Sequence, residues 1–176
     1  KEIGKNHIDI ITGGGPGLMM AANAGHMAGD KTNKADSLGL RIKLPWEIKD
    51  NRHLEIKKDF DKFSNRLDYF MALSGAVVVM PGGIGTCLEF FYALQLTQVK
   101  HVHPIPIILM GDIWKKLYIW LKQYPIKAEL VSPHDIDNVY VVKNNAEALN
   151  IIFEHYELFN KKGESHYKHI KPYTVD

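Results

Sequence analysis

The sequence predicts an α/β protein with a doubly wound parallel sheet in a single domain. Short apolar runs alternate with stretches of helical spacing, a pattern typical of parallel strands joined by right-handed helical crossovers. The run Ala76–Met80 (A-V-V-V-M) contains no polar residue, as expected for a strand that is covered on both faces. Glycine-rich turns follow two of the runs, at the carboxyl ends of strands where such sheets bind ligands.

The first half of the chain begins with a β-branched run that ends at glycines, which predicts a buried strand. The helix expected next is rich in Ala and Met, with apolar residues on more than one face, so we expect it to be buried. The elements expected here are a strand at 7–12, a turn at 13–17, a helix at 18–29, a polar loop at 30–37, a strand at 38–44 and a loop at 46–53.

The second half continues the alternation of helices and strands. Phe60, Phe63, Leu67 and Phe70 share one helical face, which predicts a helix over 60–73. The elements expected after it are a strand at 76–80, a helix at 86–99, a strand at 105–110, a helix at 113–124, a strand at 139–142 and a helix at 145–160. We therefore expect one domain over residues 1–160, followed by a polar tail over 161–176.

The composition of the 176-residue chain is that of a globular protein, with 45% hydrophobic and 24% charged residues. The net charge of +2 and the lack of a long basic run argue against nucleic-acid binding. No apolar run approaches the roughly 18 residues of a membrane span, and no signal peptide is visible. The single cysteine, Cys87, excludes an intramolecular disulfide and suits a reducing compartment, so we expect a cytoplasmic protein.

The turn that carries most information is Pro81–Glu89, P-G-G-I-G-T-C-L-E. Gly82, Gly83 and Gly85 let a ligand approach the main-chain N–H groups, and the following helix adds partial positive charge that favours a phosphate. The Thr86 hydroxyl adds a further hydrogen bond. No G-K-[ST] is present, so the turn is not a Walker loop and ATP hydrolysis is not indicated. Thr86 and Glu89 also have the spacing of a helix capping box, and the two roles do not exclude each other.

The earlier turn, Gly13–Gly17 (G-G-G-P-G), resembles a dinucleotide fingerprint but does not match it, because Leu18 stands where G-x-G-x-x-G requires glycine. Asp30 and Asp36 lie near the distance at which an acid would hold a ribose, but they stand in a polar loop where acids are common. We expect Gly14 and Gly15 of this turn to contact a ligand through the backbone, or to pack closely against the second turn.

Two side chains suggest chemistry at a ribose. Glu89 lies one turn into the helix that begins at the phosphate turn, where a carboxylate would face the sugar of a nucleoside monophosphate. A carboxylate there can orient water or stabilise an oxocarbenium-like centre, by analogy with glycoside hydrolysis. Arg66 can neutralise a phosphate or stabilise the leaving base. The alternative for Arg66 is a surface arginine that pairs with Asp61 or Asp68.

These segments resemble the LOG (Lonely Guy) family, long mislabelled as lysine decarboxylases. Its signature P-G-G-x-G-T-x-x-E matches Pro81–Glu89, and its first glycine motif and arginine segment resemble Gly13–Met19 and Phe63–Arg66. The resemblance runs from about Asp9 to about Ile152. It implies a Rossmann-like fold, usually a homodimer, and hydrolysis of a nucleoside 5′-monophosphate, of the AMP or cytokinin riboside type, to free base and ribose 5-phosphate.

Carried over residue by residue, the resemblance implies that Arg66 and Glu89 are catalytic and that Gly82, Gly83, Gly85 and Thr86 bind phosphate. It implies no metal and no organic cofactor. Lysine decarboxylation is not favoured, because it needs pyridoxal phosphate on a lysine and no lysine here has a recognisable site for it.

The chain departs from the family pattern in two places. The family usually has Arg-Lys where this chain has Arg66-Leu67, and its first strand and helix are absent ahead of Lys1, which suggests missing upstream residues. The Leu67 departure keeps a second hypothesis open, a nucleotide-binding or cofactor-carrier protein without catalysis, because Rossmann-like relatives include molybdenum-cofactor carriers.

Overall fold

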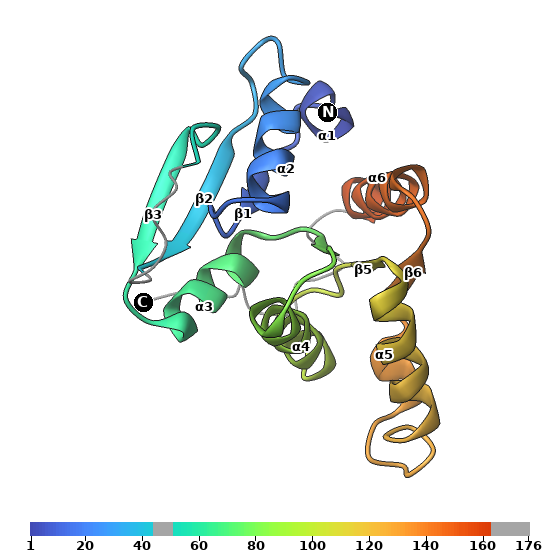
Figure 1. Cartoon of the computed structure of the whole chain (residues 1–176). Coiled ribbons are helices and arrows are strands. Elements are labelled where there is room, and N and C mark those ends of the chain that lie inside the picture. Colours follow the sequence, from blue (N-terminus) through green and yellow to red (C-terminus); the bar gives the residue numbers. More distant parts are fainter. Residues whose placement is uncertain (44–50, 163–176) are drawn as a thin grey trace. The chain divides into compact units, whose positions relative to one another are not determined.

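The computed structural model describes residues 1–43 and 51–162. The chain divides into two compact units, Lys1–Leu73 and a second that begins at Ser74. Each unit holds one three-stranded parallel sheet (Figure 1). In the described residues a helix separates successive strands of each sheet, except the last two strands of the first unit. A Rossmann-like fold is built from two such βαβ halves, so the predicted α/β fold class is confirmed.

The sheet of the first unit has the strand order β1-β2-β3. Thr12 at the end of β1 lies opposite Gly39, and Ile42 at the end of β2 lies opposite Phe60. Leu40, Ile42 and Phe60 form a buried cluster. The elements of this unit are α1 (Glu2–Lys5), β1 (Ile10–Thr12), α2 (Leu18–Met27), β2 (Ser37–Ile42), β3 (Ile56–Phe60) and α3 (Phe63–Leu73).

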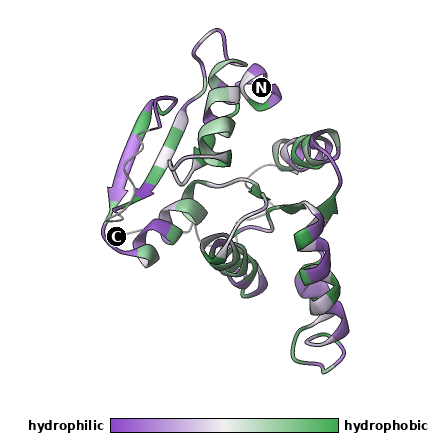
Figure 2. Cartoon of the chain, in the orientation of Figure 1, coloured by the Kyte–Doolittle hydropathy of each residue, from purple (hydrophilic) through white to green (hydrophobic). Residues whose placement is uncertain are grey.

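Strand β3 and the short helix α1 are additions to the predicted order. The helical pattern expected from Phe60 begins only at Phe63, because Phe60 is the buried last residue of β3. The other residues of β3 are exposed, and most of the strand is hydrophilic (Figure 2). Charged side chains such as Lys57 and Lys58 are the usual protection of a sheet edge against pairing with other chains.

Helix α2 is buried on one face only, which corrects the expectation of a wholly buried helix. Its buried residues are polar, Asn23 and His26, while Leu18, Met19 and Met27 are exposed. His26 is 1% exposed, and its Nε2 lies 2.9 Å from the backbone oxygen of Ile8.

The sheet of the second unit has the order β4-β5-β6, with Val77 opposite Ile107 and Ile107 opposite Val139. Ile107, Ile108 and Leu109 of the middle strand are fully buried, each worth roughly 1.5–3 kcal/mol of stabilisation relative to exposure. The elements are β4 (Val77–Val79), α4 (Ile84–Gln98), β5 (Ile107–Met110), α5 (Asp112–Gln123), a 3₁₀ turn η1 (Pro133–Ile136), β6 (Val139–Val142) and α6 (Asn145–Lys162).

The predicted strand at 139–142 has the same bounds in the structure, and the ends of the other predicted helices and strands of this unit shift by at most two residues. Part of the predicted loop at 46–53 and most of the predicted tail at 161–176 lie outside the described residues. None of the helices in the described part of the chain combines the length and the apolar character needed to cross a membrane.

Candidate functional site

The second glycine turn lies at the carboxyl end of β4 and leads directly into α4. Pro81–Gly85 is exposed, and α4 begins at Ile84 with Gly83 as its N-cap. The expected capping box of Thr86 and Glu89 is wrong: the helix begins two residues before Thr86, and no side chain in the described chain caps it. With no side-chain cap from the described residues, the first N–H groups of α4 suit an anion or water.

The three glycines of this turn differ in what surrounds them. A Cβ added to Gly82 would lie within 3 Å of the Thr86 side chain, so Gly82 is required by close packing. A Cβ added to Gly83 or Gly85 would meet no heavy atom of the described chain within 4 Å, apart from its own neighbours. Neither Gly83 nor Gly85 has a positive φ. Their small size is thus explained neither by internal packing nor by backbone conformation.

Glu89 occupies the first position of a core-facing stripe on α4. Glu89, Ala93 and Leu96 are spaced i, i+4 and i+7, so they share one helical face. Ala93 and Leu96 are buried, and Glu89 is half-buried. Side chains on a helix lean toward its N-terminus, so Glu89 lies over the turn that contains Gly85 and Thr86. A carboxylate thus stands at the glycine turn where packing alone would favour an apolar residue.

The turn packs against α5 and against Gly111, the residue before that helix. Trp114 is 1% exposed, and its indole Nε1–H donates to the backbone oxygen of Met80 at 3.1 Å. A Cβ added to Gly111 would lie 2.9 Å from the ring of Pro81, so the turn and the end of β5 are in close contact. The sequence does not predict this hydrogen bond, because its two residues are 34 positions apart and no spacing rule connects them.

The first glycine turn belongs to the first unit and is held by a hydrogen bond within that unit. Gly14 and Gly15 are buried, and the Gly14 N–H donates to Thr12 Oγ1 at 3.1 Å, so that amide is used within the fold. Gly14 has φ +72°, a conformation that favours glycine. The exposed part of the turn is Pro16 and Gly17. Ligand contact by Gly14 and Gly15 remains a prediction.

Arg66 is a buried residue of α3, so its interpretation as a surface arginine is wrong. It is 7% exposed, and its guanidinium carbon lies 5.4 Å from the Phe63 ring and 5.6 Å from the Phe70 ring. A Cβ added to Gly13 would lie 3.4 Å from Arg66 Nη1, which places the guanidinium beside the first glycine turn. Asp61, one of the partners considered for Arg66, accepts a hydrogen bond from Lys43 at 3.0 Å.

The predicted residues thus fall into two sets, one in each unit. The structure places Arg66 beside the first glycine turn, and Glu89 in the helix that begins at the second turn. Among the described residues, no group of three or more His, Cys, Asp or Glu side chains could hold a metal ion.

Asp30, considered above as a ribose-binding acid, is committed to its own loop. It is buried, and its carboxylate accepts hydrogen bonds from the N–H groups of Lys34 and Ala35, both at 2.7 Å, and from Thr32. Burial of the carboxyl opposes its ionisation, but these hydrogen bonds outweigh it and lower the pKa of Asp30 to about 2. A dinucleotide role for Asp30 is therefore not supported.

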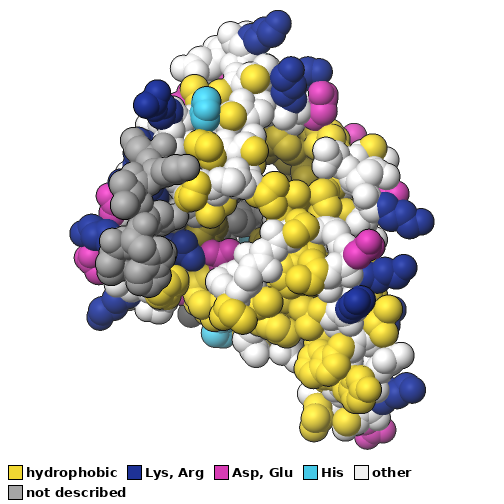
Figure 3. All heavy atoms as spheres, in the orientation of Figure 1, with side chains coloured by type: hydrophobic (Ala, Val, Ile, Leu, Met, Phe, Trp, Pro, Cys, Tyr) yellow, Lys and Arg dark blue, Asp and Glu magenta, His cyan; other side chains and the backbone are white. Residues whose placement is uncertain are grey.

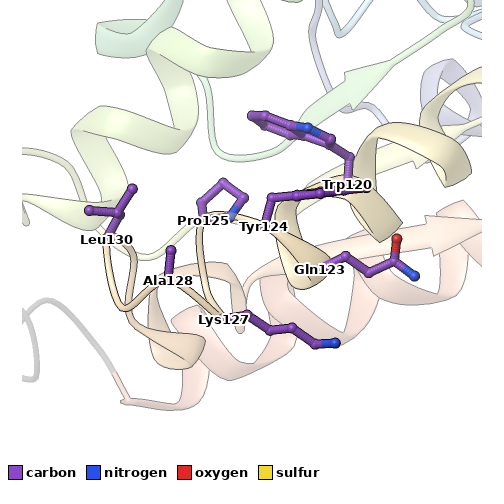
Figure 4. A pocket seen from close by; sticks show the side chains of 7 residues that line it. All are labelled: Trp120, Gln123, Tyr124, Pro125, Lys127, Ala128 and Leu130. Carbon is purple, nitrogen blue, oxygen red and sulfur yellow. The ribbon is translucent and has the colours of Figure 1, made fainter.

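A shallow hollow beside the end of α5 is apolar and distant from the glycine turn. Its lining comes from the last turn of α5 and the segment that follows, including Trp120, Tyr124 and Leu130 (Figure 4). The 12 residues of α5 span about 18 Å, and the helix begins at the sheet edge that carries the turn. Figure 3 shows hydrophobic side chains gathered at this end of the molecule. The hollow contributes no group to the candidate site.

Fold and turns together define a Rossmann-like α/β protein with glycine turns at the carboxyl ends of β1 and β4. In a comparison with sequence models of protein families, the family described as "possible lysine decarboxylase" matches residues 19–152. Because this is most of the chain, the protein belongs to that family, which agrees with the resemblance seen in the sequence.

Among curated proteins, the chain is similar to the pyrimidine/purine nucleotide 5′-monophosphate nucleosidase of Escherichia coli. The sequences are 29% identical over 119 residues in strain K12 and also in strain O157:H7. The match covers 62% of this chain and 26% of the relative, so the aligned part spans about a quarter of the length of those proteins.

Among solved structures, two molybdenum cofactor proteins share the fold. The carrier protein from Chlamydomonas reinhardtii has a TM-score of 0.62 and 20% identity, and covers 89% of this chain and 82% of its own. The binding protein from Rippkaea orientalis has a TM-score of 0.64 and 17% identity, and covers 87% of this chain and 80% of its own. At these identities the likeness establishes the fold alone.

Proposed function

We propose that this protein hydrolyses the N-glycosidic bond of a nucleoside 5′-monophosphate, giving the free base and ribose 5-phosphate. The observation that carries the proposal is the second glycine turn with Glu89 above it. Uncapped N–H groups at the start of α4 suit a phosphate, and the space beside Gly83 and Gly85 lets it approach the backbone. Glu89 then stands one helical turn further on, where the ribose of such a ligand would lie.

The proposed roles follow from the charges that the reaction develops. Water adds to C1′ of the ribose, the C1′–N bond breaks, and the base leaves with its electron pair and a proton. The Glu89 carboxylate orients the water and stabilises positive charge at C1′, as carboxylates do in glycoside hydrolysis. Thr86 and the N–H groups of α4 hold the phosphate. The role of Arg66, stabilisation of the phosphate or of the leaving base, rests on the family resemblance.

Relatives support this reaction class. Family membership together with the E. coli nucleotide 5′-monophosphate nucleosidase supports a nucleotide-related, hydrolytic activity. Because the aligned part is about a quarter of that enzyme, the reaction and the substrate of the present chain are proposals that the assay below tests.

A second candidate is a nucleotide-binding or cofactor-carrier protein without catalysis. Both solved structures with this fold that are named above carry or bind molybdenum cofactor. Leu67, which replaces the lysine usual in the LOG family, is 5% exposed and packs as a core residue. The segment that contains Arg66 has therefore lost one charge of the enzymatic family pattern, which is the observation that favours this candidate.

We also propose that the active form is a homodimer in the cytoplasm. The dimer is implied by the resemblance and is supported by an apolar stripe on α4. Ile84, Leu88 and Phe91 are spaced i, i+4 and i+7, and all three are exposed, Ile84 to 86%. This face of α4 lies opposite the one that carries Glu89, so a second copy could cover it without covering the carboxylate.

The test is to incubate the protein with AMP and measure adenine and ribose 5-phosphate by chromatography. Glu89→Gln should abolish base release while ribose 5-phosphate still binds, because the turn and the helix N-terminus remain. Glu157→Gln, an exposed carboxyl on α6, is the matched control and should keep wild-type turnover. No base release from AMP, GMP, CMP or UMP by the wild type would overturn the enzymatic proposal. Tight nucleotide binding without turnover, unchanged by Glu89→Gln, would establish the carrier.

A further inference from the structure

A buried polar network lies behind the first glycine turn, centred on the side chain of Asn23 in α2. Asn23 and Ser37 are fully buried, and Asn51 is 1% exposed. Asn23 Oδ1 accepts from Thr12 Oγ1 at 2.8 Å and from Asn51 Nδ2 at 3.0 Å, while Asn23 Nδ2 donates to Ser37 Oγ at 2.9 Å. We call these four residues the Asn23 network. None of them belongs to the proposed catalytic set.

The direction of every hydrogen bond in the network follows from two backbone groups. The N–H of His53 can only donate, and it donates to Asn51 Oδ1 at 3.1 Å, so the atom that Asn51 turns toward Asn23 is its Nδ2. Asn23 must then present its oxygen there and its nitrogen to Ser37. The carbonyl of His53 can only accept, so the Ser37 hydroxyl donates to it, at 2.8 Å. The side-chain amides thus have one fixed orientation.

The network has two arms that reach different parts of the first unit. The turn arm runs from Asn23 through the Thr12 hydroxyl, which accepts the N–H of Gly14 at 3.1 Å. The loop arm runs from Asn23 through Ser37 to His53. Because the Thr12 hydroxyl donates to Asn23, its lone pairs are free to accept from the N–H of Gly14. Gly14 has a φ of +72°, which residues other than glycine rarely adopt.

The turn arm ends beside Arg66. Gly13 precedes Gly14, and the Arg66 Nη1 atom lies 3.4 Å from the position that a Cβ on Gly13 would take. Gly13 carries no Cβ, so the guanidinium lies close to its backbone, and a change in the path of the backbone there would alter the space left for the guanidinium. The turn arm of the network thus ends next to a charged group.

We propose that Thr12 and Asn23 are positioning residues, which set the first glycine turn and, through Gly13, the place of the Arg66 guanidinium. The effect on turnover rests on the proposed function, whereas the effect on the turn and on Arg66 does not. A misplacement of about 1 Å at a reacting group can lower a rate by about 100-fold, so a network without substrate contact can control turnover.

The two arms allow a matched test. Thr12→Val keeps the shape of the side chain but removes the hydroxyl of the turn arm, and Ser37→Ala removes the hydroxyl of the loop arm. Each leaves buried polar groups unpaired, so each should lower the melting temperature. We expect kcat for AMP to fall at least about tenfold in Thr12→Val with little change in KM, and to stay within about twofold of wild type in Ser37→Ala. Thr12→Ser, which restores the hydroxyl, should restore kcat.

A second readout does not depend on activity. In ¹⁵N-labelled protein, Thr12→Val should shift the side-chain Nε signal of Arg66 and speed hydrogen exchange at the Gly14 amide, whereas Ser37→Ala should change neither. If wild-type protein releases no base but these signals behave as expected, the proposed function fails and the positioning role stands. Unchanged Arg66 and Gly14 signals in a folded Thr12→Val protein, or equal losses of kcat in Thr12→Val and Ser37→Ala, would overturn the positioning role.

Discussion

Single residues decide how the second glycine turn can be used. The sequence presents Gly82, Gly83 and Gly85 as equivalent members of one motif, but their surroundings divide them. Gly82 lies against the Thr86 side chain, whereas Gly83 and Gly85 border open space. Internal packing therefore explains the first glycine, and access for a ligand explains the other two. A substitution at Gly85 should therefore affect ligand binding without lowering the stability of the fold.

Gly85→Ala should leave the fold as stable as wild type or more stable, by up to about 1 kcal/mol, because Gly85 lies in the first turn of α4 and alanine favours helix. The added methyl group should weaken binding of ribose 5-phosphate about tenfold or more, by obstructing its approach to the backbone. Thermal unfolding and calorimetric titration measure the two effects. Gly82→Ala is the contrast, because its Cβ would clash with Thr86 and lower the melting temperature. A Gly85→Ala protein that binds as tightly as wild type would show that no phosphate uses this space.

At the same scale, the sequence predicts candidate site residues but not the local structure around them. Glu89 was a candidate because of its distance from the turn, and that distance also fitted a capping box. The start of α4 at Ile84 removes the cap. Spacing alone could not predict where α4 begins, because the glycines before Thr86 are compatible with a helix that starts at Ile84 and with one that starts after Thr86. Trp114 and Thr12 were out of reach of sequence reasoning, since their roles depend on partners brought close only by folding.

At the scale of the elements, the conformation of the segment between α2 and β2 depends on the carboxylate of Asp30. Asp30 accepts hydrogen bonds from Thr32, Lys34 and Ala35, and His7 Nδ1 lies 3.2 Å from its carboxylate. These bonds require the ionised form, which is why they lower the pKa despite the burial of the group. The segment is thereby tied to the N-terminal end of the chain and to the start of β2.

The pH dependence of stability should reveal this tie. The pKa of Asp30 is about 2 in the folded protein and 3.8 as an ordinary value, so its contribution is complete above about pH 4 and is lost as the pH falls toward 2. Asp30→Asn should lower the free energy of unfolding at neutral pH, and the difference from wild type should shrink below pH 4. Urea unfolding followed by circular dichroism at a series of pH values measures it. A difference that is the same at pH 3 and pH 7 would contradict the assigned pKa.

The elements that the sequence missed share a physical reason. Strand β3 has the sequence I-K-K-D-F, in which only Phe60 is buried, so it lacks both the apolar run and the alternation that identify strands. Helix α1 has four residues, too few for a helical period to be seen. By contrast β5 and β6 are apolar along most of their length, and their hydrophobicity alone identified them.

For the whole molecule, the exposed stripe of α4 bears on assembly. Leu88→Glu places a charge in the middle of the stripe formed by Ile84, Leu88 and Phe91. If this face joins two copies, the wild type should be a dimer by light scattering and Leu88→Glu should be a monomer with the same secondary structure. Lys115→Glu, an exposed change on α5, is the control and should stay dimeric. A monomeric wild type at micromolar concentration would contradict the dimer.

The fold class could be predicted for the whole molecule because alternation of strands and helices is written along the chain and does not depend on distant contacts. The sequence could not predict that the strands divide between two three-stranded sheets, because an apolar run indicates a strand but not the strand with which it pairs. The same limit applies to the site. Arg66 and Glu89 belong to different units, and it is the family pattern that connects them.

The position of the Trp114 indole has a further consequence, for the intrinsic fluorescence of the protein. It is buried in the second unit, and its N–H is bonded to the carbonyl of Met80, the residue immediately before Pro81 and the glycine turn. Indole emission responds to hydrogen bonding and to nearby charge, so an anion that settles on the turn acts on a fluorophore already in place. Trp120, which is 45% exposed, can be replaced by phenylalanine to reduce the background. The protein thus carries its own reporter for ligand titrations, with no label added beside the turn.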